Sequence, residues 1–560
     1  MKNRLNLAVL LTIILIAGFL RLYNLRSIPP HLTPDEAALG YNAYSILKTG
    51  KDEYGKFLPI VFKSFGDYKP GLYIYSIVPS IAILGLNEFS VRFPSAIFGI
   101  ISVYLVYLIS NILFEKKFTK YNLEFGIIPA VLLAINPWHI HFSRGAWEIN
   151  LSLMLTLSGI YFFFKSLQKQ RYLVLSVVSF ALTLLAYQGA KLSTGIVVLI
   201  LFFLYAKQIL SLKIKNVVIP VIFGLVIAFP IILSLFSGQT GRLNVFSVFS
   251  YPRPKEYLQT FLDEGGEKVG NIDYYLYHSE TYNFLRGVLG RYFNHYSDRF
   301  LFFEGDWQNP RHSPPNQGLF IHLDMILLIT GIVYLVKRKT DKASLFVWLW
   351  LLLASLPSVL SRDQVHAVRS FNLVTPFIIL NAFGVLQLTE WISKVKLKSA
   401  LYIISTFGVL IYFANYMYFL DAYFIHLSIH DSKYWEYGYK QIVETVTPIQ
   451  NNYKRIEIQQ SYAQPYIYFL FYQKYDPVKY QKQARLKENA SGDVGQVEQI
   501  DNIYFVPIDW SRNRGDHGSL VVADLERIPD ADSADTNQFN LIQRINYLDG
   551  RTAFKIIEIK

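Results

Sequence analysis

The sequence predicts a polytopic α-helical membrane protein that carries a small α/β domain at its C-terminal end. Of the 560 residues, 52% are hydrophobic and only 17% are charged, whereas soluble domains contain about 25% charged residues. Apolar runs of roughly 20 residues, long enough to cross a bilayer, recur over the first three quarters of the chain. After residue 430 charges become more frequent and short β-like runs replace the apolar ones. This composition excludes a disordered chain and argues against an ordinary soluble enzyme.

The apolar runs predict the membrane-spanning helices. They cover 6–22, 93–114, 125–141, 147–164, 172–187, 192–206, 216–236, 319–336, 343–360, 370–390 and 399–420. The first run follows Lys2 and Arg4 and has no evident small-residue cleavage site before Arg21, so we expect an uncleaved span rather than a signal peptide. Allowing for irregular segments, the pattern predicts about 11–13 spans in a membrane region of residues 1–425.

Basic loops predict how the spans are oriented. Loops rich in Lys and Arg alternate along the chain with loops that have few basic residues, and basic short loops stay in the cytoplasm. The basic loops are 115–120, 165–171, 207–215, 336–342 and 393–398, and the others are 142–146, 188–191, 237–318 and 361–369. We therefore expect a multi-pass protein of the plasma membrane with a cytoplasmic N-terminus. The first outer loop (23–70), the large outer loop (237–318) and the C-terminal domain (430–560) would then be extracytoplasmic.

This topology also explains the net charge of +13. Most of the excess lies in the cytoplasmic loops, so we expect no nucleic-acid partner. The apolar segment 71–86 departs from the alternation, because it is short and contains Pro79. A full crossing there would invert every later basic loop. We therefore expect it to be re-entrant or to lie in the outer interface.

The C-terminal domain is predicted from alternating residue patterns. A helical stretch over 433–446 precedes strand-like runs at 456–460, 466–472, 502–508, 519–525, 541–546 and 553–560. The chain has no cysteine, and Walker, GxGxxG, HExxH and GxSxG motifs do not occur in a convincing context. These observations argue against an ATP-driven pump, a Rossmann enzyme, a serine hydrolase and thiolate chemistry.

The first outer loop contains an acidic pair, Asp35 and Glu36. Thr33 can cap the helix that follows, whose apolar stripe (Ala37, Ala38, Tyr41, Ala43, Tyr44 and Leu47) suits the membrane surface. Adjacent carboxylates at a helix start can simply complement the helix dipole. At the outer surface of a membrane they are also a suitable general base for a hydroxyl.

Further ionisable residues lie near other predicted outer span ends. Lys69 precedes Pro70 where the chain re-enters the interface, and can contact a lipid phosphate or only snorkel. Arg92 lies at the mouth of a span. The remaining candidates are His139, His141, Arg144 and Glu148 in one hairpin, Tyr187, Gln188 and Lys191 in a tight turn, Glu304, Asp306, Arg311 and His312 in a Pro-rich segment, and His366 with Arg369 before a span.

Two pairs of residues in the hairpin are weak evidence for a functional site. Histidines at positions i and i+2, such as His139 and His141, are a poor helical metal pair, and Arg144 and Glu148 are spaced as a structural ion pair. The stronger signal is that all these groups share one side of one membrane. Acids, arginines and lysines around one outer cavity suit an anionic lipid-linked donor and a hydroxyl acceptor.

Ordered motifs carry a family resemblance. The order TPDEA, KPGLY, NEFSVRFPSAIFG, a P…SR…E hairpin and YQGAK resembles the bacterial lineage of protein O-mannosyltransferases and aminoarabinose transferases. These are GT-C glycosyltransferases that use polyprenyl- or dolichyl-phosphate sugars. The resemblance covers roughly residues 5–425, is densest over 20–195 and implies a GT-C fold. No middle β domain of the eukaryotic enzymes is present, and the C-terminal domain matches no ligand-binding module.

The resemblance implies roles for eight residues. It implies that Asp35 is catalytic, with Glu36 beside it and Glu148 as a second acid. The groups implied to bind the donor phosphate and carrier are Lys69, Arg92, Arg144, His366 and Arg369. The implied reaction is a single inverting displacement, in which Asp35 takes the proton of an acceptor hydroxyl and polyprenyl phosphate leaves.

Several functional questions stay open at this point. The expected partners are a polyprenyl-phosphate-linked sugar donor, membrane lipids, and a protein, glycan or lipid acceptor. No cofactor is certain, and the sequence leaves a divalent metal open. A flippase for a lipid-linked sugar is the alternative function, although it predicts polar groups in mid-span, and the spans are nearly free of charge. A non-catalytic membrane scaffold is the third hypothesis.

Overall fold

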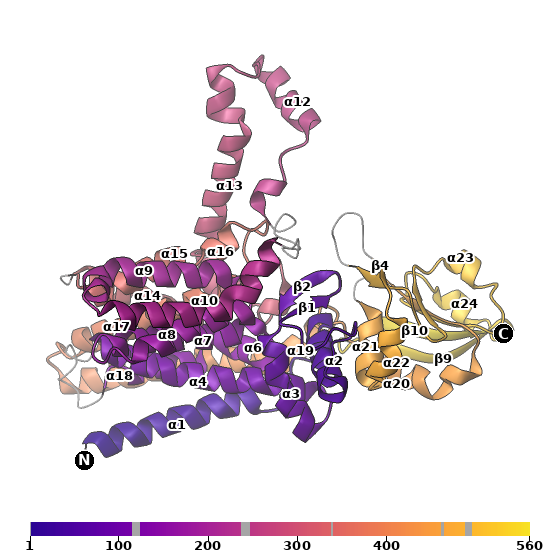
Figure 1. Cartoon of the computed structure of the whole chain (residues 1–560), viewed down its shortest axis with the longest axis horizontal. Helices are drawn as coiled ribbons and strands as arrows, with labels where there is room; N and C mark the ends of the chain where they lie inside the picture. The colour runs from indigo at the N-terminus through magenta and orange to yellow at the C-terminus, as the bar shows by residue number, and fades with distance from the viewer. Residues whose placement is uncertain (1, 115–123, 237–246, 338–339, 461–463, 488–494) are drawn as a thin grey trace.

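The computed structural model describes the chain except for residues 1, 115–123, 237–246, 338–339, 461–463 and 488–494 (Figure 1). Long helices run side by side in a bundle. The N-terminus lies at one end of this bundle and the C-terminal domain adjoins the opposite end. We call that opposite end the domain end.

The bundle confirms the prediction of a multi-helix membrane protein. Among the described residues, eight helices are long and apolar enough to cross a membrane by length and composition. The bundle helices are α1 (Lys2–Leu22), α4 (Glu88–Phe114), α7 (Glu148–Ser166), α8 (Tyr172–Ala186), α9 (Ala190–Leu210), α10 (Ile214–Phe236), α14 (Asp324–Val336), α15 (Lys342–Leu353), α16 (Leu356–Val359), α17 (Val374–Ile392) and α18 (Lys398–Asp421). Helices α8 and α14 are apolar but shorter than the rest.

One expected span is instead two helices. The run 125–141 forms α5 (Ile127–Ile135) and α6 (Pro137–Arg144), so the prediction of a continuous span there is wrong. Asn136 has an extended backbone, and its side chain accepts the backbone N–H of His139. Pro137 follows at the first position of α6, where its missing N–H costs nothing. The chain therefore changes direction at Asn136.

Contacts among the described residues bear on the predicted loop positions, whose sidedness stays a prediction. The loop 115–120 lies outside the described residues. At the end opposite the domain, Asn216 hydrogen-bonds to Gln170, and Lys342 lies over the ring of Tyr205, 5.2 Å from its centre. Gln170 and Lys342 belong to the predicted basic loops 165–171 and 336–342, and Asn216 and Tyr205 flank the loop 207–215, so these three loops lie near one another at one end.

Helix α3 (Leu72–Leu84) does not cross the bundle. It follows Lys69, which pairs with Asp35 at the domain end, and leads into Glu88, whose carboxylate binds Lys440 of the C-terminal domain. Both ends of α3 therefore lie at the domain end, as predicted for residues 71–86.

The C-terminal domain is built on a mixed six-stranded sheet of order β6-β7-β3-β8-β10-β9. Strand β3 (Ile456–Gln459) is parallel to β7 (Ile503–Val506) and β8 (Leu520–Ala523), and β10 (Thr552–Ile559) is antiparallel to β8 and β9 (Phe539–Asn546). The remaining elements are α19 (Leu427–His430), α20 (Tyr439–Ile449), α22 (Pro477–Gln483), α23 (Trp510–Asn513), α24 (Asp530–Ala534), β4 (Leu486–Lys487), β5 (Gln496–Val497) and β6 (Gln499–Ile500).

The strand expected over 466–472 is wrong, because this segment is the helix α21 (Pro465–Tyr472). Residues from Pro465 to Phe471 are all buried. A short apolar run buried on every side has no distinctive period, so the pattern could not separate strand from helix.

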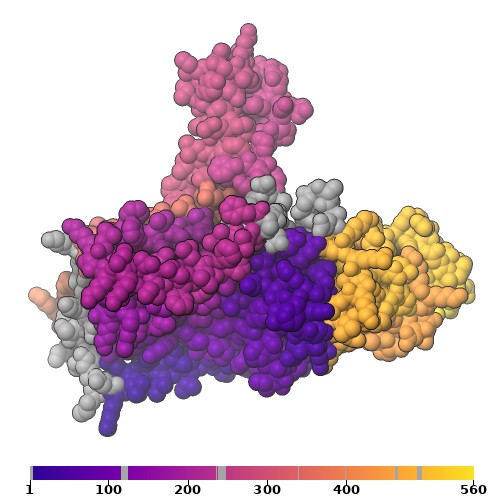
Figure 2. Space-filling model, viewed as in Figure 1, coloured from indigo at the N-terminus to yellow at the C-terminus, as the bar shows by residue number. Residues whose placement is uncertain are grey.

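Helix α21 packs against α2 (Pro34–Thr49), and one hydrophobic core continues from the first outer loop into the sheet. Most of the apolar stripe of α2 (Ala37, Ala38, Tyr41 and Ala43) is therefore buried in this core rather than lying on the membrane, whereas Leu47 at its end is exposed. Figure 2 shows the two regions in direct contact. Tyr41 donates to the carbonyl of Tyr475 at 3.2 Å, and Tyr468 donates to that of Leu32 at 3.0 Å.

An arm formed by α12 (Lys255–Gly265) and α13 (Glu280–Asn294) projects from the bundle, across the direction of its helices (Figures 1 and 2). Apolar side chains such as Leu285 and Phe293 are exposed on it.

Candidate functional site

An exposed carboxylate and a largely buried lysine form the centre of the site. Strands β1 (Val61–Ser64) and β2 (Asp67–Pro70) form a hairpin that turns at Phe65 and Gly66, both at positive φ. This turn is favoured because it matches the strand twist. It brings Lys69 into an ion pair with Asp35 in the first turn of α2. The side chain of Asp35 is 57% exposed and that of Lys69 is 18% exposed.

Two further groups lie near this pair. Glu148, the first residue of α7, is half-buried and interacts electrostatically with Lys69 and Asp35. The phenol of Tyr187 lies among the charges of Arg369, Glu148 and Lys69. Burial opposes the charge of Lys69, but Asp35 and then Glu148 outweigh it and raise the pKa of Lys69 above its ordinary value. The lysine therefore stays cationic at neutral pH.

Glu36 and Arg92 form a separate, buried pair. Arg92 donates to Glu36 from Nε at 2.9 Å and from a terminal nitrogen at 3.2 Å. The other N–H groups of Arg92 donate to the carbonyls of Leu25, Pro29 and His31. With no exposed surface and its donors engaged, Arg92 cannot contact a donor phosphate in this arrangement.

Glu36 is likewise engaged within the protein. Its carboxylate accepts the backbone N–H of Thr33 and that of Ala146, both at 2.9 Å, and completes a capping box with Thr33. The expectation that Glu36 is a catalytic neighbour of Asp35 is therefore corrected: Glu36 fixes the start of α2. Asp35 lies one position earlier on the helix and points to a different environment.

Arg144 is also buried, and its terminal nitrogens are engaged within the protein. It donates to the carbonyls of Leu20 at 2.8 Å and Ile28 at 2.9 Å, and its guanidinium lies over the ring of Phe424. The expected carrier contact is corrected to a structural one, in which Arg144 joins α6 to the chain that leaves α1. It forms no ion pair with Glu148 among the pairs of the described residues.

Arg369 is partly exposed, and its charge acts on the Tyr187 phenol, which also interacts with Glu148 and Lys69. Its guanidinium donates to Asp363 at 2.5 Å and to Ser361 at 2.8 Å. Asp363 was not expected from the sequence, because only the folded loop brings it back to Arg369. His366 lies in the same turn, where its Nδ1 receives the backbone N–H of Arg369 at 3.4 Å.

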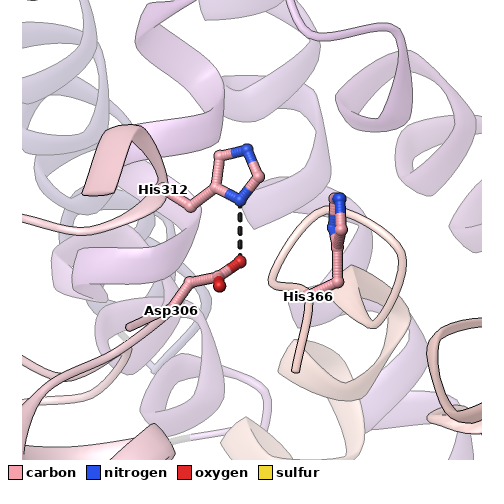
Figure 3. Close-up of side chains that lie close together, drawn as sticks. All are labelled: Asp306, His312 and His366. Atoms are coloured by element: carbon pink, nitrogen blue, oxygen red, sulfur yellow. Dashed lines mark hydrogen bonds and ion pairs between the residues drawn. The ribbon is translucent and has the colours of Figure 1, made fainter. Parts of the chain in front are cut away.

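His366 belongs to a cluster with Asp306 and His312 (Figure 3). The sequence singled out all three residues but did not associate them, because a long stretch of chain separates His366 from the others. The other two histidines, His139 and His141, are buried in contacts with Arg21 and with the carbonyl of Arg311. They do not form a metal pair.

Comparison with known proteins finds a protein family that matches part of the chain and solved structures that have a similar fold. Residues 69–236 match the family described as dolichyl-phosphate-mannose-protein mannosyltransferase. A search of curated proteins finds no significant match.

The fold is similar to that of ArnT from Cupriavidus metallidurans. The structure of ArnT bound to undecaprenyl phosphate is 12% identical, with a TM-score of 0.52, over 98% of this chain and 97% of that chain. The apo structure gives 11% identity and a TM-score of 0.51 over the same shares. The oligosaccharyltransferase AglB from Archaeoglobus fulgidus is 13% identical, with a TM-score of 0.48, over 84% of this chain and 64% of that chain.

The resemblance found in the sequence is thus confirmed by two independent observations. The family match covers the segment that contains Lys69, Arg92 and Glu148, and the ArnT fold extends over nearly the whole chain. The roles of individual site residues stay predictions. Residues 69–236 thus match a family of lipid-phosphate-dependent mannosyltransferases, and the fold of nearly the whole chain is similar to that of ArnT.

Proposed function

We propose that the protein transfers a sugar from a polyprenyl-phosphate donor to a hydroxyl group of an acceptor, with inversion at the anomeric carbon. The observation that carries this proposal is the Asp35–Lys69 pair, which places an accessible carboxylate against a cation at the domain end. The matched family is named for dolichyl-phosphate mannose, and the ArnT structure contains undecaprenyl phosphate. Both names support a lipid-phosphate carrier.

Asp35 is the proposed general base. Its exposed carboxylate removes the proton of the acceptor hydroxyl as the oxygen forms a bond to the anomeric carbon. The bond between that carbon and the phosphate oxygen breaks, and polyprenyl phosphate departs with the electron pair. Lys69, which stays cationic, stabilises the departing phosphate, and Arg369 offers a second cation across Tyr187.

The remaining site groups support this reaction indirectly. Glu148 adds negative potential beside Lys69 and suits a hydroxyl of the donor sugar. The Glu36–Arg92 pair fixes the start of α2 and so the position of Asp35.

We propose that the domain end faces away from the cytoplasm. The basic loops at the opposite end favour a cytoplasmic location for that end. This orientation places the site and the C-terminal domain outside the plasma membrane, where an outward-facing lipid-linked sugar is accessible. The acceptor class, whether protein, glycan or lipid, is the first result that the assay below would give.

Asp35→Asn tests the proposed base. Membranes containing the protein are supplied with a panel of radiolabelled polyprenyl-phosphate hexoses and pentoses, and label transferred to protein, glycan and lipid fractions is counted. We expect Asp35→Asn to lower the transfer rate by about 10²–10⁴-fold, the usual contribution of a general base. Transfer at the rate of the unaltered protein would contradict the assignment.

Glu304→Gln provides a matched control. The side chain of Glu304 is 50% exposed and pairs with Arg299 at 2.6 Å, so it resembles Asp35 in exposure and in having a cationic partner. It is not part of the proposed machinery, and its removal is expected to leave transfer unchanged. If both variants lost activity equally, the loss would come from surface charge rather than from a base.

A further inference from the structure

A carboxylate and two imidazoles converge at the domain end outside the groups used in the proposed transfer step. Asp306 and His312 belong to the segment before α14, and His366 belongs to the loop before α17. One ligand atom from each of the three lies within 4.8 Å of those of the other two (Figure 3). The rings of His312 and His366 are 5.0 Å apart between their centres.

Asp306 is a buried anion without a permanent cationic partner. It has no exposed surface. Its carboxylate accepts from His312 Nδ1 at 2.7 Å, from the backbone N–H of Ala367 at 2.8 Å and from Asn309 at 3.0 Å. Among the residues described by the structure, no lysine or arginine forms an ion pair with it. A buried carboxylate of this kind is costly unless a positive charge accompanies it.

We propose that Asp306, His312 and His366 bind a divalent transition-metal ion, with Zn²⁺ as the best-suited ion. Two imidazoles and one carboxylate form a ligand set that zinc uses when a fourth position stays open to water or substrate. Imidazole ligands disfavour Mg²⁺ and Ca²⁺, which prefer oxygen. The ion would supply the positive charge that Asp306 otherwise lacks.

Only a small contraction is needed to form such a site. Zinc–ligand bonds of about 2.0–2.1 Å place tetrahedral ligand atoms roughly 3.4 Å apart, so a separation at the 4.8 Å limit must close by about 1.4 Å. Rotation of the half-buried His366 side chain can provide this movement. His312 is held more firmly, since its ring packs edge-on against Trp147 and His141 donates to the adjacent carbonyl of Arg311 at 2.8 Å.

Surrounding contacts are typical of a metal site. Asp306 is oriented by Asn309 and by the backbone of Ala367, as carboxylate ligands commonly are. The ion would join the segment before α14 to the loop before α17, two parts of the chain that the membrane helices α14 and α15 separate. Arg369 follows His366 by three residues, so the ion would also fix the turn that presents Arg369.

Metal content and thermal unfolding test the proposal without any activity assay. The full-length protein is purified in detergent with its affinity tag removed, and its zinc is counted by mass spectrometry before and after dialysis against EDTA and reloading with Zn²⁺ or Mg²⁺. We expect close to one zinc per chain. We also expect an unfolding midpoint that falls with EDTA and recovers with Zn²⁺ but not with Mg²⁺.

His312→Gln and His366→Gln are the test variants. Loss of an orienting partner alone lowers metal affinity by about 10–100-fold, so loss of a ligand should lower it at least as much. His366 is half-buried and its replacement is the less disruptive of the two. The matched control is His426→Gln, which removes a half-exposed histidine paired with Asp421 at 3.1 Å and should keep its zinc.

The proposal is overturned if the untagged protein binds no Zn²⁺ and its midpoint does not respond to EDTA or Zn²⁺. It is also overturned if a folded His366→Gln variant, eluting from size exclusion like the unaltered protein, binds zinc as the unaltered protein does. In either case the cluster is a metal-free His–Asp pair. These readouts do not depend on sugar transfer, so they are separable from the outcome for Asp35.

Discussion

Replacing Glu36 by Gln should destabilise the protein far more than replacing its neighbour Asp35 by Asn. The two acids are adjacent in sequence, but the side chain of Glu36 is 3% exposed and that of Asp35 is 57% exposed. One Glu36 oxygen accepts from Arg92 Nε and Ala146 N, and the other from Thr33 N and a terminal nitrogen of Arg92. Each oxygen therefore faces two donors.

This geometry sets the magnitude of the effect. In Glu36→Gln the new NH₂ group must oppose two N–H donors, and the buried guanidinium of Arg92 loses its counter-charge. Removing one partner of a buried ion pair costs about 3–5 kcal/mol of folding free energy. The exposed pair of Asp35 contributes no more than about 1 kcal/mol. Glu36→Gln should thus lose several times more stability than Asp35→Asn.

The assay is the free energy of unfolding, measured by SDS titration in mixed micelles and followed by circular dichroism. Glu88→Gln adds an intermediate case, since Glu88 is 6% exposed but its partners Arg26 and Lys440 are 64% and 29% exposed. We expect the losses to rank Glu36, then Glu88, then Asp35. A loss below about 1 kcal/mol for Glu36→Gln, or an equal loss for Asp35→Asn, would refute the reasoning.

Two further predictions concern the contact between α2 and the C-terminal domain. Gly40→Ala should lower the thermal-unfolding midpoint, because its new Cβ would lie 2.6 Å from a Val91 methyl and 2.7 Å from the ring of Phe471. The control is Gly195→Ala, where a Cβ meets nothing within 4 Å. An unchanged midpoint for Gly40→Ala would contradict the packing described here. Burial raises the pKa of Glu53 from 4.5 to about 8, so between these pH values the folded state keeps a proton that the unfolded state loses. The stability contributed by protonated Glu53 is therefore full below about pH 4.5 and is lost as pH rises through about 8. Unfolding midpoints followed across this range should fall more steeply for the unaltered protein than for Glu53→Gln, and parallel curves would show that Glu53 does not carry the effect.

Local signals in the sequence identified much of the site. The Thr33 cap, the Lys69-Pro70 element and the placement of charges at outer loops each depend on a few neighbouring residues, and the structure brings Asp35, Lys69 and Glu148 together. The alternation of basic loops and the unusual length of segment 71–86 can also be recognised from the sequence alone, because they depend only on local charge and on the length of an apolar run.

Contacts that depend on how distant or looped segments fold together could not be predicted from local sequence signals. Glu36 and Asp35 look equivalent in sequence, and only the approach of Arg92 from α4 makes one structural and leaves the other exposed. Asp363 and Arg369, and the cluster around Asp306, likewise depend on loops that fold back. The helix α21 was mistaken for a strand because burial on all sides removes the periodic signal.

The docking of the C-terminal domain on α2 has a consequence for how the chain is made. Tyr41 and Tyr475, which meet through a hydrogen bond, are 434 positions apart. At the usual pace of synthesis, about 5–20 residues per second, the first outer loop waits tens of seconds for its partner. During that interval the apolar side of α2 that packs on α21 is uncovered. Chains terminated before α21 would therefore expose a surface that quality-control proteases recognise.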